Sequence, residues 1–133
     1  MIRIGVIGCG QWGRNYVRVL GHLGHAARVV ETGDRDRASL AGLRRRFPPV
    51  NVVLDPGQLI ENPSVDGVVI ASPATTHAGL ATKALQAGKH VMVEEPSATA
   101  LADAVRLHEW CSTTWTRSSR CGSSTRGSRS PAR

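Results

Sequence analysis

Three closely spaced glycines stand near the start of the chain, in the run Gly8-Cys9-Gly10-Gln11-Trp12-Gly13. A β-branched run, residues 2–7, precedes them and a helical pattern follows, which places them in a strand-to-helix turn. There Gly8 permits the tight bend, Gly10 lets an anion approach the backbone, and Gly13 allows close packing of helix on strand. Free N–H groups at the helix start favour an anion. The run predicts a binding turn for the diphosphate of a dinucleotide, with a tight turn lacking any ligand as the alternative.

An acidic residue, Asp34, follows the second predicted strand, 21 positions after Gly13. A carboxylate at this place accepts hydrogen bonds from the ribose hydroxyls of adenosine, which favours NAD. Arg35 and Arg37 stand beside it, and an arginine there can accommodate the 2′-phosphate of NADP. The simpler interpretation of both arginines is a solvated helix start. The sequence therefore predicts a site for NAD, with NADP as the alternative.

The elements that must position these residues alternate between short β-branched runs and helical patterns, which is typical of βαβ units and a parallel sheet. Strands are predicted over residues 2–7, 28–33, 52–54, 65–71 and 90–93. Helices are predicted over residues 13–23, 37–47 and 76–87, with one helical turn over 58–61 and a last helix, N-capped by Thr99, that ends at Trp110. On the first helix, one face is predicted to carry Trp12, Tyr16, Val17 and Leu20. The predicted fold is α/β: a Rossmann-type, doubly wound parallel sheet, incomplete at about five strands in the order 3-2-1-4-5.

The composition changes sharply after Trp110. Residues 111–133 contain only Cys, Ser, Thr, Trp, Arg, Gly, Pro and Ala, so they offer little apolar area to offset the entropy of ordering. We therefore expect two regions, a dinucleotide-binding domain over residues 1–110 and a disordered Ser/Arg-rich tail over residues 111–133. The tail fits either a genuine basic extension or a stretch read in a shifted frame.

The net charge of +7 over 133 residues could indicate a nucleic-acid partner. However, five arginines lie after Trp110, and the preceding residues carry 12 basic against 10 acidic side chains. Nucleic-acid binding is therefore the least favoured function. The three cysteines have unrelated spacings that suggest neither a disulfide framework nor a metal site. With no signal-peptide pattern and no apolar stretch of membrane-spanning length, we expect a cytoplasmic protein without a membrane partner.

Three segments together resemble the glucose-fructose oxidoreductase, inositol dehydrogenase and rhizopine-catabolism (Gfo/Idh/MocA) family of dehydrogenases. They are residues 4–13, residues 69–77 (Val-Ile-Ala-Ser-Pro-Ala-Thr-Thr-His) and residues 88–96 (Gly-Lys-His-Val-Met-Val-Glu-Glu-Pro). The resemblance implies that the loop containing Ser72, Pro73 and His77 lies over the diphosphate and the nicotinamide ribose. We favour a role for His77 in ordering this loop over a catalytic one. Glu94 matches a family glutamate that can bind the nicotinamide-ribose hydroxyls, and Pro96 is expected to follow a cis peptide.

The chain departs from the family in two respects. The family pattern has a lysine where this chain has Glu95, and a carboxylate cannot donate the hydrogen bonds or supply the positive charge of that lysine. The family also continues into a substrate domain, and nothing after Trp110 matches it, so no catalytic residue is assigned. The resemblance implies a truncated NAD(P)-dependent dehydrogenase acting on a sugar, nucleotide sugar or cyclitol once a substrate domain is supplied. The alternative is a non-catalytic NAD(P)-binding module.

Overall fold

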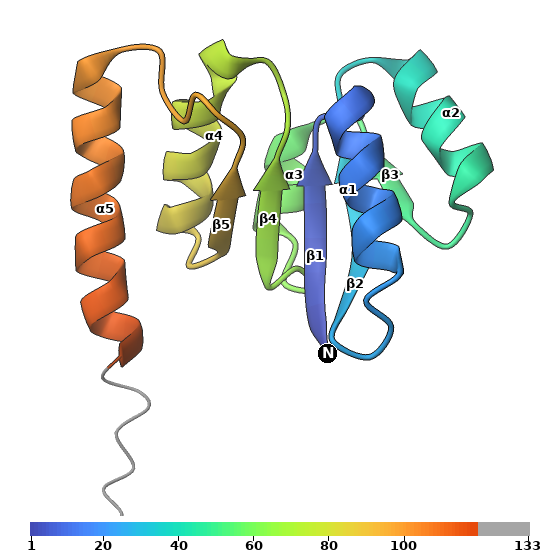
Figure 1. Cartoon of the computed structure of the whole chain (residues 1–133), viewed down its shortest axis with the longest axis horizontal. Coiled ribbons are helices and arrows are strands. Elements are labelled where there is room, and N and C mark those ends of the chain that lie inside the picture. The colour runs from blue at the N-terminus through green and yellow to red at the C-terminus, as the bar shows by residue number, and fades with distance from the viewer. Residues whose placement is uncertain (120–133) are drawn as a thin grey trace, which may run out of the picture.

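The computed structural model describes residues 1–119, in which five parallel strands form one sheet in the order β3-β2-β1-β4-β5 (Figure 1). The strands are β1 (Ile2–Ile7), β2 (Ala27–Gly33), β3 (Asn51–Val53), β4 (Gly67–Ile70) and β5 (His90–Val93). The helices are α1 (Gln11–Gly21), α2 (Arg37–Arg46), α3 (Pro56–Glu61), α4 (Ala74–Gln86) and α5 (Leu101–Ser119). The predicted α/β class, Rossmann-type topology and strand order are therefore confirmed.

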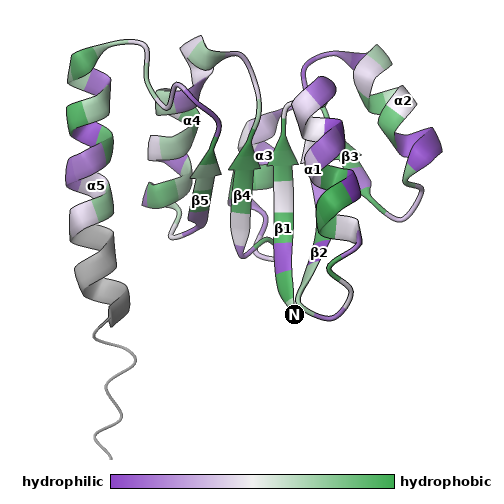
Figure 2. Cartoon of the chain, viewed as in Figure 1, coloured by the Kyte–Doolittle hydropathy of each residue, from purple (hydrophilic) through white to green (hydrophobic). Residues whose placement is uncertain are grey.

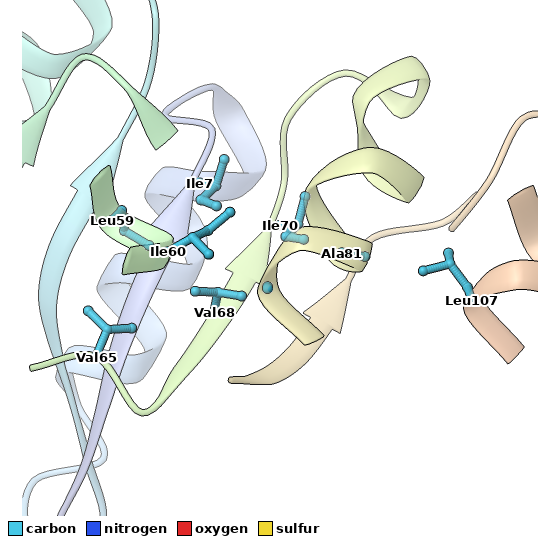
Figure 3. Close-up of a cluster of buried hydrophobic side chains, with 9 residues drawn as sticks. Ile7, Leu59, Ile60, Val65, Val68, Ile70, Ala81 and Leu107 are labelled. Atoms are coloured by element: carbon cyan, nitrogen blue, oxygen red, sulfur yellow. The ribbon is translucent and has the colours of Figure 1, made fainter. Parts of the chain in front are cut away.

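Two hydrophobic cores lie on opposite faces of the sheet because successive residues of a strand point to opposite sides. Val6 and Val69 pack with Val17 of α1 and with Leu40 and Leu43 of α2. Their neighbours Ile7, Val68 and Ile70 face the other way and pack with residues of α3, α4 and α5, as Figure 3 shows. Figure 2 shows the same hydrophobic concentration along the central strands β1 and β4. Burial on both faces explains why β4 reads as a continuous apolar run.

Helix starts next to the candidate site are set by local side-chain chemistry. Asp36 caps α2, accepting hydrogen bonds from the backbone N–H groups of Ala38 and Ser39 at 3.1 and 3.0 Å. Asp55 caps α3 in the same way through Gly57, and Pro56 occupies the first turn of that helix. A carboxylate at these positions satisfies N–H groups that have no partner within the helix. Both caps lie just beyond the carboxyl ends of strands, so they set the positions of the loops at that edge.

Three predictions about the helices need correction. Trp12 does not share a buried face with Val17, because its side chain is 61% exposed while that of Val17 is buried. The last helix begins at Leu101, after Ala100, whose carbonyl accepts from Asp103 and Ala104, so Thr99 is one position too early for the cap. That helix also continues past Trp110 to Ser119. The rest of the predicted tail, residues 120–133, lies outside the described residues.

Part of one face of the sheet has no helix over it. In Figure 1, β4 and β5 lie uncovered on the side that carries α1 and α2. A shallow cavity of about 200 Å³ opens there, lined mainly by apolar residues of β1, β4 and β5. Ile2 and Met92 are more than half exposed on this surface. Among residues 1–119, none of the helices is both long enough and apolar enough to span a membrane.

Candidate functional site

The strand register brings four loops to one edge of the sheet. Ile7 pairs with Gly33 on one side and with Ile70 on the other, and Ile70 pairs with Val93. The four strands therefore end at the same level. Backbone hydrogen bonds continue this alignment into the loops, where the N–H groups of Gly8, Asp34, Ala71 and Glu94 each donate to a neighbouring strand. In an open parallel sheet, ligands bind beyond the carboxyl ends of the strands, so this edge is the candidate site.

The glycine turn has the geometry that the sequence predicted. Gly8 adopts φ +93°, and a Cβ there would lie 2.6 Å from the backbone of Ala71 and Ser72. A Cβ on Gly13 would lie 1.7 Å from the carbonyl oxygen of Gly8, so α1 packs against the turn at a distance only glycine allows. A Cβ on Gly10 would have no atom within 4 Å. Gly8 and Gly13 thus have structural roles, and Gly10 is the position open to a ligand.

The start of α1 suits an anion. Gly10 is the N-cap and offers no side-chain acceptor to the first turn of this helix. Gln11 and Trp12, two of the predicted binding residues of this turn, are both exposed. The N–H groups and the positive end of the helix dipole therefore face a region that no capping side chain occupies. This arrangement fits the diphosphate of a dinucleotide.

Cys9 differs from the other residues of the turn because its side chain is fully buried in the core beneath α1. Burial, and secondarily the negative charge of Asp34, raises the pKa of the Cys9 thiol to about 11. The thiol is therefore protonated at neutral pH and is not a nucleophile. The backbone of Cys9 is engaged within the protein: its N–H donates to Asp34 and its carbonyl accepts from Arg14 Nε at 3.0 Å.

Asp34 joins the glycine turn to the loop after β2. Its Oδ2 accepts from the N–H of Cys9 at 2.6 Å, and its Oδ1 accepts from the N–H of Asp36 at 2.8 Å. A carboxylate offers about four acceptor positions, so it can still accept bonds from two ribose hydroxyls. Arg35 is exposed next to it. The structure thus gives Asp34 a second role, as a tie between two loops, that sequence reasoning did not find.

The loop from Ser72 to His77 is braced internally. Ser72 Oγ and Thr76 Oγ1 lie 2.7 Å apart, and Thr76 Oγ1 donates to the carbonyl of Pro73 at 2.7 Å. The His77 ring is 2% exposed, with Nε2 2.6 Å from the carbonyl oxygen of Ser72 and Nδ1 2.9 Å from that of Pro96. His77 therefore links this loop to the one after β5, as expected of a residue that orders the loop.

A cavity of about 330 Å³ lies between these loops. Its lining combines the glycine turn, the loop after β2, α3 and the loop after β4, through Ile7, Gly8, Gly33, Asp34, Arg35, Asp36, Pro56, Ser72, Pro73, Thr76 and Leu80. The apolar lining residues suit a flat aromatic ring, and the acidic residues suit hydroxyl donors. Of the predicted site residues, the cavity brings Gly8, Asp34, Arg35, Ser72 and Pro73 together. His77 lies behind it, buried.

Glu94 and Glu95 differ in environment although they are adjacent. Glu94 is half-buried at the end of β5, where its Oε1 accepts a hydrogen bond from the hydroxyl of Tyr16. Glu95 is exposed. The peptide between Glu95 and Pro96 is cis, as predicted. Glu94 is thus tied to α1 through Tyr16, whereas Glu95 faces solvent.

Sequence reasoning missed three contributors to this edge. Tyr16 contacts Glu94, Thr76 braces the loop after β4, and Arg14 bonds the carbonyl of Cys9. Thr76 stands four residues after Ser72, a spacing that could have suggested the contact on a helix start. Tyr16 and Glu94 are far apart in the sequence, and no sequence signal links them.

Comparison with known proteins agrees with this geometry. Residues 2–117 match the oxidoreductase family with an NAD-binding Rossmann fold, Gfo/Idh/MocA. Inositol 2-dehydrogenase 2 of Saccharopolyspora erythraea is 38% identical over 108 residues, which cover 81% of this chain and 32% of that protein. The chain thus spans about a third of the length of the curated relatives it matches.

Solved structures show the same relationship. A myo-inositol dehydrogenase from Lactobacillus casei, in complex with NAD(H) and myo-inositol, aligns with a TM-score of 0.79 at 31% identity, covering 85% of this chain and 34% of that one. The WlbA dehydrogenase from Bordetella pertussis, in complex with NADH and UDP-GlcNAcA, aligns with a TM-score of 0.79 at 27% identity, covering 86% and 35%. The chain belongs to the Gfo/Idh/MocA oxidoreductase family, of which it carries the NAD-binding Rossmann domain.

Proposed function

We propose that this domain holds NAD(H) across the carboxyl edge of its sheet, as the cofactor-binding part of a dehydrogenase. The main support for this proposal is the common register of β1, β2, β4 and β5, which brings the glycine turn, Asp34, Ser72 and Glu94 to one edge. In this arrangement the start of α1 binds the diphosphate. Asp34 binds the adenosine ribose, Ser72 and Pro73 cover the diphosphate, and Glu94 binds the nicotinamide ribose.

The proposed reaction is hydride exchange between C4 of the nicotinamide and a carbon bearing a hydroxyl. Relatives are named for inositol and nucleotide-sugar substrates, which supports a cyclitol, sugar or nucleotide sugar as the substrate class. The protein contributes binding and orientation, and the nicotinamide supplies the hydride chemistry. A substrate domain must complete the site, because the described residues contain the cofactor edge alone.

A second candidate, a cofactor-binding module without catalysis, is favoured by one observation. Glu95 occupies the place of the family lysine and is exposed as a carboxylate. It cannot donate a hydrogen bond to a substrate hydroxyl when ionised. Assaying NADH formation with a panel of polyols, sugars and nucleotide sugars, with the chain supplied with a substrate domain, distinguishes the two: turnover supports the dehydrogenase, and cofactor binding without turnover supports the module.

Titration with NADH tests the binding proposal. We expect saturable binding in the micromolar range or weaker, followed by NADH fluorescence, because only the cofactor edge is present. NADPH is expected to bind more weakly, since its 2′-phosphate meets the charge of Asp34. The replacement Asp34→Ser removes that repulsion, so the preference for NADH over NADPH, measured as the ratio of their dissociation constants, should fall about tenfold.

The matched variant Asp34→Asn keeps an acceptor oxygen for the Cys9 N–H while removing the charge, so it separates repulsion from loop distortion. A preference that is unchanged in both variants would show that Asp34 is misassigned and would favour Arg35 as a ligand of NADP. If neither NADH nor NADPH binds saturably, the dinucleotide site itself is wrong.

We also propose that the chain works in the cytoplasm, since its described cysteines, Cys9 and Cys111, are both free thiols. A buried free thiol such as Cys9 is ordinary in a reducing compartment. Activity measured in cytoplasmic and envelope fractions of the source cells tests the location.

Among residues 1–119, β5 is an edge strand, and we propose this edge as a site of self-association. The N–H groups of His90 and Glu94 bond toward β4, so by alternation those of Val91 and Val93 point away from it. An unpaired strand edge next to an apolar face is a template for association with a second copy.

We therefore expect the chain to self-associate as its concentration rises, and Met92→Lys to reduce this by placing a charge on the exposed apolar face. Sedimentation velocity across a hundredfold concentration range measures the self-association of both chains. The control is Val19→Lys, which adds the same charge at a comparably exposed site on α1. A single monomeric species at every concentration would contradict the proposal.

A further inference from the structure

The hydrogen bond between Tyr16 and Glu94 joins two segments with different roles in the proposed site. Tyr16 lies on α1, the helix whose start faces the diphosphate, and Glu94 lies at the end of β5. The two residues are 78 positions apart in the sequence. Both are half-buried. In the sheet, β4 separates β5 from β1, so the long tyrosine side chain reaches from α1 to the strand beyond β4.

Tyr16 is well placed to orient another residue because its own backbone is firmly held. It lies one turn after Gly13, where α1 is packed against the carbonyl of Gly8. Its neighbour Val17 is buried in the core between α1 and the sheet. A side chain on such a rigid element places its hydroxyl reproducibly.

The side chain of Glu94 requires a hydrogen-bond donor that orients it. Its backbone is held by the bond from its N–H to Ile70, at 3.0 Å, but a glutamate side chain has three rotatable bonds and lies at the end of an edge strand. A flexible carboxylate loses conformational entropy when it binds a ligand. A donor that fixes one oxygen beforehand reduces that loss and orients the other oxygen.

We propose that Tyr16 is a positioning residue: its hydroxyl holds Glu94 Oε1, so that Oε2 is presented to the hydroxyls of the nicotinamide ribose. The proposal rests on the dinucleotide binding proposed above. Through this bond, α1 contributes to two parts of the cofactor site: its N-terminus binds the diphosphate, and Tyr16 orients Glu94 toward the second ribose. The carboxylate also raises the pKa of Tyr16, mainly by accepting its hydrogen bond, which keeps the tyrosine a donor at neutral pH.

The alternative is a purely structural tie between α1 and β5, and three ligands separate the two roles. ADP contains the adenosine ribose and the diphosphate, whereas ADP-ribose adds the second ribose and NADH adds the nicotinamide as well. A positioning role affects only ligands that contain the second ribose. A structural role affects all three alike, because it acts through the glycine turn.

The experiment measures the dissociation constants of ADP, ADP-ribose and NADH for the whole chain and for Tyr16→Phe, which removes only the hydroxyl. We expect ADP-ribose and NADH to bind about fivefold more weakly and ADP to bind within twofold of the unchanged chain. Glu94→Gln should weaken the same two ligands, and adding Tyr16→Phe to Glu94→Gln should cost little more, since the pair acts as a unit.

If Tyr16→Phe weakened the binding of ADP and of ADP-ribose equally, the positioning role would be overturned. Unchanged affinities for both ligands would overturn it as well. If the unchanged chain binds ADP but gains nothing from the second ribose, Glu94 is not a ribose ligand and the inference fails while diphosphate binding stands. If it does not bind ADP, the proposed function fails first.

An independent readout uses the single tyrosine of the chain, which makes its ionisation visible in the ultraviolet. We expect Tyr16 to titrate at higher pH than free tyrosine, and Glu94→Gln to lower that pH. A titration unaffected by Glu94→Gln would show that the bond does not exist in solution and would overturn the inference.

Discussion

Gly13→Ala is expected to unfold the glycine turn and to abolish dinucleotide binding. The added Cβ would lie 1.7 Å from the carbonyl oxygen of Gly8 and 2.8 Å from its carbonyl carbon, and both are backbone atoms that no side-chain rotation can move. Either α1 must move away from β1 or the turn must rearrange. We expect the free energy of unfolding to fall by about 3 kcal/mol, the upper end for overpacking. Urea unfolding and NADH titration of the same sample measure both effects.

Two other glycines provide matched controls. A Cβ on Gly10 would meet no atom within 4 Å, so Gly10→Ala should leave the urea midpoint nearly unchanged while weakening NADH binding at the open position. Gly42 lies inside α2, again with no atom within 4 Å of an added Cβ, so Gly42→Ala should stabilise the domain by up to about 1 kcal/mol without affecting NADH. A Gly13→Ala chain with a normal midpoint would refute the close packing of α1 on the turn.

His77→Ala is expected to produce the second large effect, on stability and on binding together. The ring is 2% exposed, and its two nitrogens lie within 3 Å of the carbonyl oxygens of Ser72 and Pro96. Removing it creates a cavity and takes a hydrogen-bonding partner from both loops. We expect a loss of about 2–4 kcal/mol in the free energy of unfolding. NADH should bind at least several-fold more weakly, because the loop proposed to cover the diphosphate is no longer anchored.

The control for this change is His25→Ala, which removes an exposed histidine and should alter the free energy of unfolding by no more than about 0.5 kcal/mol. The result also decides between two roles of His77. A residue that orders the loop changes stability and affinity together, whereas a residue that acts only in catalysis would leave the midpoint unchanged. A normal midpoint for His77→Ala would therefore contradict the loop-ordering role.

The errors in the predicted helices have identifiable causes. Apolar spacing predicts a common face for Trp12 and Val17, but Trp12 lies in the first turn of α1, at the exposed edge of the site. The sequence pattern predicts an end of the last helix at Trp110, because the aliphatic residues stop there. Each residue added to an existing helix gains a backbone hydrogen bond, however, so polar residues can extend a helix once it has begun. Ser112, whose hydroxyl bonds the carbonyl of His108 at 2.9 Å, lies in this extension.

The resemblance to the family pointed to the loops that carry Ser72 and Glu94. The sequence by itself determined the order of strands and helices, the glycine turn and Asp34. These features depend on local rules: hydrophobic periodicity, the conformational freedom of glycine, and acids or prolines that start or stop helices. Such rules act over a few residues, so they can be read from one chain.

Only the tertiary structure decided which side chains meet across the sheet. The bond between Tyr16 and Glu94, the tie from Asp34 to the N–H of Cys9, and the bridge from His77 to Pro96 all join residues that are distant in sequence. Their contacts depend on strand register and on the separation between α1 and β1. A shift of either by a few ångströms would break the bonds while leaving every local pattern in the sequence unchanged.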